Sequence, residues 1–192
     1  KILDNNGIVQ LPESFSSLTH LQYLSLTHND ITSLPSNIGN LTSLKFLDLK
    51  QNEFISLPPS IGQLSNLLEL NLHSNTLPTL PDEIGSLTSL NRLVLSETQL
   101  SSIPPSIGDL TNLQYLDING NQLALSTLPD EICALSSLIE LKMNNNVISS
   151  LPENIGDLQS LRILNANDNF LTSIPSSFCN LHPSCEVDIA YN

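Results

Sequence analysis

Any catalysis or metal binding in this 192-residue chain would fall to its histidines, serines and acids. His28 and His73 each stand just ahead of an asparagine, at the end of a segment that predicts a short strand. If these segments form a parallel sheet, the two histidines lie two strands apart, at about 9.6 Å. Zinc holds each nitrogen ligand at about 2.1 Å, so this pair cannot share a metal ion.

Other catalytic patterns are not met either. No serine has a histidine and an acid matched to it in this arrangement, and Asp48 and Asp117 are three strands apart. No GxxxxGK[ST] phosphate loop occurs. We therefore expect no catalytic residue, no metal site, no cofactor and no enzymatic activity.

Three neighbouring segments are rich in amide and carboxylate oxygens: Asn119-Gly120-Asn121, Asn144-Asn145-Asn146 and Asn167-Asp168-Asn169. Such oxygens can bind calcium. However, carboxylates are few and Lys142 lies among them. We interpret the segments as a polar ladder, with sugar binding as a minor alternative.

These segments belong to a repeat that runs through the chain. A Leu-Pro or Ile-Pro pair returns every 23 residues, with one step of 25. A period of this length predicts a solenoid, in which stacked coils share one core. The long step contains two extra residues between Leu123 and Leu128, most simply Ala124 and Leu125, which we expect to bulge from the edge of the turn. The pairs begin at Leu11, Leu34, Leu57, Leu80, Ile103, Leu128, Leu151 and Ile174.

Each repeat predicts one strand, a turn and a return segment. Leu24 and Leu26 should face the interior, while Tyr23, Ser25 and Thr27 face outward, because side chains alternate along a strand. We expect the asparagine that follows each strand to bond the backbone of its own and adjacent coils. Thr98 breaks this column and should give a looser contact. The expected ladder residues are Asn6, Asn29, Asn52, Asn75, Asn121, Asn146 and Asn169.

The motif LxxLxLxxNxL resembles the leucine-rich repeat family over the whole chain, and the ending LPxxIGxL resembles its 23-residue bacterial, Scribble-type and plant Ras-group-like forms. The resemblance implies an α/β fold, a right-handed horseshoe with a parallel sheet on the concave face and short helical or 3₁₀ turns on the convex face. We expect residues 1–192 to form a single solenoid of about eight repeats, and to be a fragment of a longer chain.

The formal charge of −13 disfavours nucleic acid and anionic membranes as partners, since both are bound through clustered Lys and Arg. No run of about 18 apolar residues predicts membrane insertion. All six basic residues lie in or beside the predicted strands, and the return segments carry acids alone. The strand face therefore has mixed charge, which is typical of a recognition surface.

Three cysteines leave one unpaired. Cys133 occupies a column of small residues and is interpreted as a buried thiol. Cys179 and Cys185 could form a disulfide bond, which would indicate an oxidising compartment, or could remain free.

We predict that the protein is a scaffold or recognition module that binds a protein through its concave strand face. Two alternatives stay open: the recognition arm of a larger GTPase, ligase or kinase, and an extracellular receptor or adhesin that binds a glycan or a surface protein. Aromatic residues and arginine dominate binding hot spots, so Tyr23, Phe46, Arg92 and Tyr115 are the preferred anchors. The full predicted set is Tyr23, Phe46, Lys50, Glu69, His73, Arg92, Tyr115, Asp117, Glu140 and Lys142.

Overall fold

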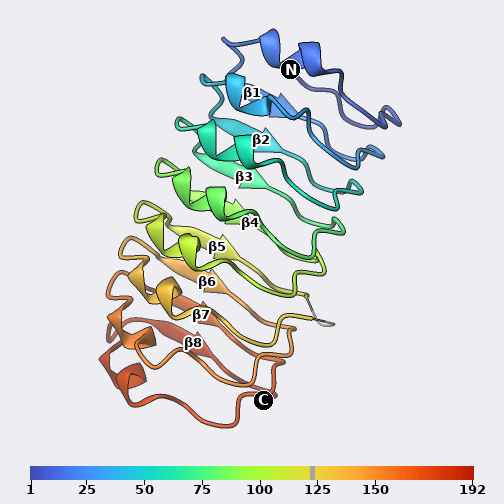
Figure 1. The fold of residues 1–192 in the computed structure, drawn as a ribbon. Helices are drawn as coiled ribbons and strands as arrows, with labels where there is room; N and C mark the ends of the chain where they lie inside the picture. The colour runs from blue at the N-terminus through green and yellow to red at the C-terminus, as the bar shows by residue number, and fades with distance from the viewer. Residues whose placement is uncertain (122–123) are drawn as a thin grey trace.

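The computed structural model describes residues 1–121 and 124–192. Within them, each coil adds one strand to a single eight-stranded parallel sheet, in chain order (Figure 1). Equivalent residues are in register, so that Leu24 lies beside Leu47 and Leu47 beside Leu70. The strands are β1 (Tyr23–Ser25), β2 (Phe46–Asp48), β3 (Glu69–Asn71), β4 (Arg92–Val94), β5 (Tyr115–Asp117), β6 (Glu140–Lys142), β7 (Ile163–Asn165) and β8 (Glu186–Asp188).

The return segment of each described coil contains a short 3₁₀ helix, on the side of the coil away from the sheet (Figure 1). Few residues are available per coil, which suits the tight 3₁₀ turn better than an α-helix. Proline fits its start, where a missing N–H leaves no bond unmade. The helices are η1 (Glu13–Ser17), η2 (Ile38–Asn40), η3 (Pro59–Gln63), η4 (Asp82–Ser86), η5 (Pro105–Asp109), η6 (Asp130–Ala134), η7 (Ile155–Asp157) and η8 (Ser176–Asn180).

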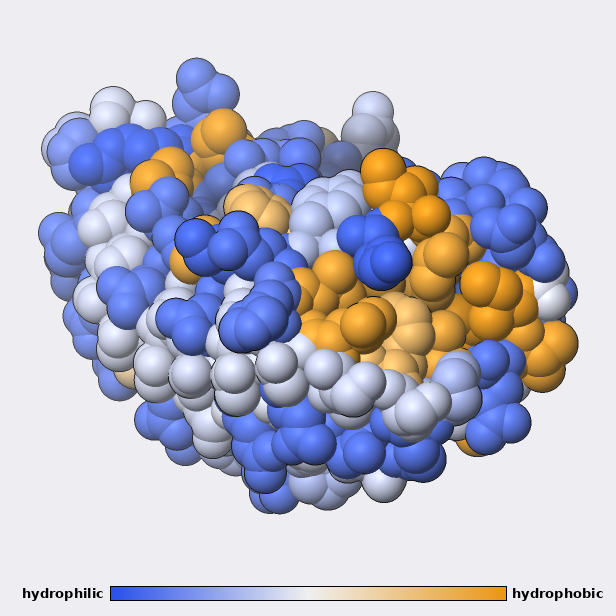
Figure 2. Space-filling model, turned by 90° about the horizontal axis from the view of Figure 1, so that it is seen from above, coloured by the Kyte–Doolittle hydropathy of each residue, from blue (hydrophilic) through white to orange (hydrophobic). Residues whose placement is uncertain are grey.

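The core is one continuous column of aliphatic side chains between the sheet and the 3₁₀ helices. Strand leucines such as Leu24 and helix residues such as Ile38 are fully buried, and both meet their counterparts from the next coil. A single coil could not cover this surface, so stacking creates the core. At the N-terminal end an apolar patch is open to solvent (Figure 2), and Ile2, Val9 and Leu18 are exposed in that coil.

Glycines in the 3₁₀ helices allow successive coils to approach closely. A Cβ atom on Gly108 would lie 2.6 Å from the carbonyl oxygen of Glu131 in the next coil, and one on Gly62 would lie 2.5 Å from that of Glu83. Real Cβ atoms do not approach carbonyl oxygens so closely. The glycine column therefore sets the spacing between coils on the convex side.

The position assigned to the insertion was wrong. Leu125 is fully buried in the core, and its carbonyl accepts a hydrogen bond from the Val147 amide, as Phe54 does from Thr76. Leu125 thus fills a regular core position and does not bulge. The extra residues therefore precede Leu125. Leu123, after which they had been placed, lies outside the described residues.

No helix in the described part of the chain combines the length and the hydrophobicity that crossing a bilayer requires.

Candidate binding face

Buried asparagines hold the turn that follows each strand, and so fix the edge of the binding face. The Asn75 side-chain amide donates to the Leu72 carbonyl in its own coil and to the Leu49 carbonyl in the preceding coil, at 2.8 and 3.1 Å. Its Oδ1 accepts from the Phe54 amide at 3.0 Å. One side chain therefore satisfies three backbone groups in two coils, groups that would otherwise be buried unpaired.

The same contacts recur at other positions of the column. The buried Asn52, Asn121, Asn146 and Asn169 each bridge two coils in this way. Asn29 and Asn192 do so as well. Asn6 differs: it is exposed, and its side-chain amide donates to the nearby Asp4 carbonyl.

The first column of the strand face brings the predicted anchors together in register. Tyr23 pairs with Phe46, Phe46 with Glu69, Glu69 with Arg92 and Arg92 with Tyr115. Tyr23 is 45 % exposed, and the other four are exposed or partly exposed. Four adjacent strand pairs thus present one continuous row of large side chains above the sheet.

One end of this row is a cluster of charged side chains around the Tyr115 ring. The Arg92 guanidinium lies 3.6 Å from the centroid of Tyr115, and the Lys142 ammonium lies 5.2 Å from the same ring. Lys142 also pairs with Glu140 at 3.0 Å. Partial burial opposes its charge, but the Glu140 and Tyr115 contacts outweigh that cost and raise the pKa of Lys142. The cluster holds four flexible side chains in one arrangement before any partner arrives.

The other end of the row is aromatic. The rings of Tyr23 and Phe46 are tilted by 41°, with centroids 6.1 Å apart, a favourable geometry for an aromatic pair. Beside them a hollow of about 100 Å³ opens toward Arg92. Its lining is mixed: Tyr23, Leu47, Asp48, Glu69, Leu70, Asn71, Arg92 and Val94.

The second and third columns of the strand face, four and two residues before each ladder position, are more buried than the sequence suggested. Asp117 is 7 % exposed, and its Oδ1 accepts from the backbone and side-chain amides of Asn119 at 3.1 and 2.7 Å. Its prediction as a contact residue is therefore corrected: Asp117 supports the face from below. Lys50 stays partly exposed, and its ammonium lies 3.9 Å from Asp48.

The structure also joins a serine, a histidine and an acid, which the sequence analysis had excluded. His73 Nδ1 lies 3.0 Å from Ser96 Oγ, and His73 Nε2 lies 3.0 Å from Ser74 Oγ, which donates to Glu97 at 2.9 Å. His73 and Ser96 occupy the same position in adjacent repeats, as do Ser74 and Glu97. This shared position was the signal that was missed. Ser96 is 4 % exposed, so a substrate would have little access to its hydroxyl. The chain of bonds orients the His73 ring on the face.

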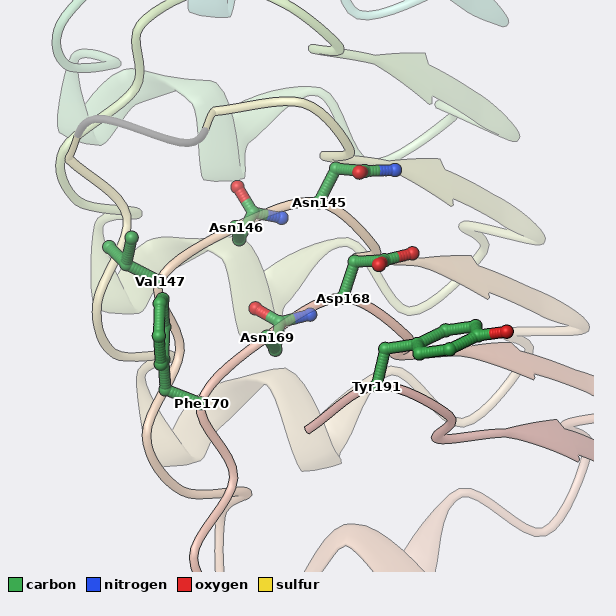
Figure 3. Close-up of a pocket in the computed structure, with 7 residues that line it drawn as sticks. All are labelled: Asn145, Asn146, Val147, Asp168, Asn169, Phe170 and Tyr191. Atoms are coloured by element: carbon green, nitrogen blue, oxygen red, sulfur yellow. The ribbon is translucent and has the colours of Figure 1, made fainter.

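The asparagine-rich segments do not form one cluster, because their three residues point in different directions. Asn146 and Asn169 are buried in the ladder, while Asn145 and Asp168 stand at the rim (Figure 3). Among the described residues, no group of His, Cys, Asp or Glu could hold a metal ion. Cys133, Cys179 and Cys185 are all free thiols, so the candidate Cys179–Cys185 disulfide is not formed.

Comparison with known families agrees with this geometry. A family described as "Leucine-rich repeat region" matches residues 9–97, "Leucine Rich repeats (2 copies)" matches 88–130, and "Leucine Rich Repeat" matches 160–181. The chain is a leucine-rich repeat solenoid. This fold is commonly a protein-binding module, and its repeats alone are typically recognition elements without catalytic activity. No curated protein matches the sequence significantly.

Solved leucine-rich repeat structures match nearly the whole chain. A leucine-rich repeat protein of Leptospira interrogans is 35 % identical, with a TM-score of 0.65; the match covers 95 % of this chain and 52 % of that one. The ectodomain of the Arabidopsis thaliana receptor kinase GASSHO1/SCHENGEN3, complexed with CASPARIAN STRIP INTEGRITY FACTOR 2, is 26 % identical, with a TM-score of 0.84 and coverage of 99 % and 23 %. The plant peptide hormone receptor RGFR1, complexed with RGF2, is 31 % identical, with a TM-score of 0.73 and coverage of 97 % and 35 %. The chain thus spans about half or less of their lengths.

Proposed function

We propose that this solenoid is a protein-recognition module that binds its partner on the strand face between β1 and β6. The observation that carries the proposal is the preorganised row on the first column: the Tyr23–Phe46 pair at one end, and Arg92 fixed on Tyr115 at the other. These residue types dominate binding energy in protein interfaces.

Within each coil, the side chains that stabilise the fold are different from those of the first column, and this supports the same proposal. Core leucines and ladder asparagines account for packing and for buried backbone groups, and neither needs the first-column side chains. An aromatic and charged row that the fold does not require is best explained by contact with another molecule. RGFR1, to which this chain is similar, is a plant peptide hormone receptor solved in complex with RGF2, and this similarity supports the proposal.

The charges indicate the character of the partner. Lys142 is engaged by Glu140 and Lys50 lies near Asp48, but no acid within the described residues pairs with Arg92. Glu69, in register beside Arg92, likewise has no ion pair there. We propose that a protein segment with both an acidic and a basic residue binds Arg92 and Glu69.

The repeats are further assigned to the 23-residue LPxxIGxL subclass. A recognition arm of a larger enzyme, or an extracellular receptor or adhesin, would use the same face.

Photo-crosslinking tests the location of the site. A photoreactive amino acid replaces Phe46 on the strand face or, as a matched control, Glu83, which is exposed on η4. In extract of the source cells, we expect a discrete crosslinked protein from position 46 and none from position 83. Crosslinks from position 83 alone would refute the proposed face.

Substitution then tests the anchors against that captured partner. Arg92→Ala and Tyr115→Ala should each weaken binding by about tenfold, the loss typical of an interface hot spot. Glu83→Ala should leave affinity unchanged, and thermal melting should show that all variants remain folded. Unchanged affinity in a protein with Tyr23, Phe46, Arg92 and Tyr115 all replaced by alanine would refute the mechanism.

A further inference from the structure

A second surface lies at the rim, where each strand ends and the chain turns into the solenoid. Two columns of side chains flank this turn. The inner rim column is the residue before each ladder position, held at positive φ, and the outer rim column is the residue after it. The inner rim column comprises Asn5, His28, Gln51, Ser74, Glu97, Gly120, Asn145, Asp168 and Tyr191.

In the last three coils these columns enclose an open trough of about 430 Å³ (Figure 3). Asn145, Asp168 and Tyr191 point to one side of it, and Val147 and Phe170 to the other. The buried ladder residues form its floor. This volume falls within the range of small-molecule sites.

The repeat itself sets the exposure of these side chains. In earlier coils the inner rim residues His28 and Gln51 are exposed, and so are the outer rim residues Asp30 and Glu53. In these coils both rim columns face solvent, as they do at Asp168, Phe170 and Tyr191. The trough at the last coils is distinguished by its residue types, since there the outer rim carries Val147 and Phe170 and the inner rim ends at Tyr191.

Two aromatic rings and two polar groups without hydrogen-bond partners line this trough. Tyr191 is 82 % exposed and Phe170 is 63 % exposed. Tyr191 holds φ at 56°, a left-handed conformation that bulky residues rarely adopt. The side chains of Asn145 and Asp168 make no hydrogen bond to any residue that the structure describes. Their amide and carboxylate groups are therefore available to a ligand.

We propose that this trough binds a neutral glycan. A sugar ring has an apolar C–H face, whose hydrogens carry partial positive charge, and an aromatic ring has a negative face that attracts them. The hydroxyl groups of the sugar can donate hydrogen bonds to the Asp168 carboxylate and accept them from the Asn145 side-chain amide. Tyr191 would stack on the sugar while the two polar groups fix its orientation.

Charge and pattern narrow the ligand class. The net charge of −13 and the Asp168 carboxylate disfavour sulfated and sialylated sugars. A helical peptide would need a continuous apolar stripe, whereas one side of this trough carries the polar Asn145 and Asp168. The trough is separate from the proposed protein-binding face, so each of the two proposals can be confirmed or refuted independently of the other.

An NMR titration of the chain tests the site with the methyl glycosides of glucose, galactose, mannose and N-acetylglucosamine. We expect at least one to give saturable shifts at the Tyr191 and Phe170 rings and at the Asn145 side-chain amide. The negatively charged methyl glycoside of N-acetylneuraminic acid should give none. Absence of saturable shifts with all four neutral glycosides would overturn the proposal, as would a response to the charged glycoside alone.

Matched variants assign the response to the trough. Tyr191→Ala and Asp168→Ala should each weaken glycoside binding by about tenfold or more. His28→Ala, at the inner rim of an earlier coil, and Arg92→Ala, on the protein-binding face, should leave it unchanged. All four side chains are exposed or partly exposed, so melting temperatures should change little. Binding that survives both trough variants would overturn the proposal.

Discussion

The ladder has one defect, at Thr98, and it offers a quantitative test of how the turns are held. Thr98 is fully buried, and its hydroxyl lies 2.8 Å from the Leu95 carbonyl and 3.1 Å from Asn121 Oδ1. It cannot reach the preceding coil as an asparagine does. Among the described residues, no group accepts a hydrogen bond from the buried Leu77 amide. The next residue, Gln99, takes a positive φ of 61° that its counterparts lack in most other coils.

We predict that Thr98→Asn stabilises the protein. By analogy with Asn75, the new Oδ1 should accept from the Leu77 amide, and the new amide should donate to the Leu72 carbonyl. Each such bond contributes about 0.5–1.5 kcal/mol net, and the hydroxyl contact to Asn121 is lost. The expected gain in unfolding free energy is therefore about 1–2 kcal/mol. For a chain of this size that raises the melting temperature by about 2–8 °C.

Urea denaturation measures the effect as a shift of the midpoint with an unchanged slope. Thr98→Val is the matched control, since it keeps the shape of the side chain and removes the hydroxyl. We expect Thr98→Val to lose about 1–2 kcal/mol. If Thr98→Asn unfolds at or below the wild-type midpoint while Thr98→Val is neutral, hydrogen bonding at this position does not hold the turn, and the ladder argument is refuted.

Three further predictions follow from packing, hydrogen bonding and ionisation. Gly108→Ala should lower the unfolding free energy by about 1–3 kcal/mol through crowding against the next coil; an unchanged urea midpoint would contradict it. Asn75→Ala should lower it by about 1–3 kcal/mol in calorimetry, whereas Asn6→Ala, at an exposed position, should be nearly neutral. Burial, and to a lesser degree nearby acids, raises the pKa of Cys133 to about 11. The thiolate is the reactive form, so at pH 8 iodoacetamide should label Cys133 more slowly than exposed Cys179, and Cys133 labelling should keep accelerating as the pH rises toward 11. Equal labelling rates at pH 8, followed by mass spectrometry, would rule this out.

The architecture was predictable because the repeat specifies each level of it. Leucines two residues apart, as at Leu24 and Leu26, predict a strand with one buried face, and a fixed period places successive strands in register. The short return segments with proline predict short helical or 3₁₀ turns, and the structure shows 3₁₀ helices there. These inferences need only local spacing and the rule that each coil must bury its apolar side.

The details that escaped the sequence depend on side-chain reach. Alternation indicates that Asp117 faces outward, but it does not show that Asp117 is buried and accepts two hydrogen bonds from Asn119. The His73–Ser96 contact required pairing the same column in adjacent repeats. The Leu125 error had another cause. Counting forward from Leu123 makes Ala124 and Leu125 the extra residues, whereas counting back from Leu128 makes Leu125 a regular core residue. The burial of Leu125, which the sequence does not display, supports the second count.

A solenoid separates stability from recognition more completely than a compact domain does. The core and the ladder fix the backbone coil by coil, and the strand face and rim then present side chains at a spacing of about 4.8 Å. Changing Arg92 or Tyr191 should therefore alter binding with little effect on folding, while changing Asn75 should do the reverse. On this scaffold the proposed protein-binding face and the proposed glycan trough occupy different columns, and their coils overlap only at β6. One fold can thus carry two independent sites, because neither takes part in holding the coils together.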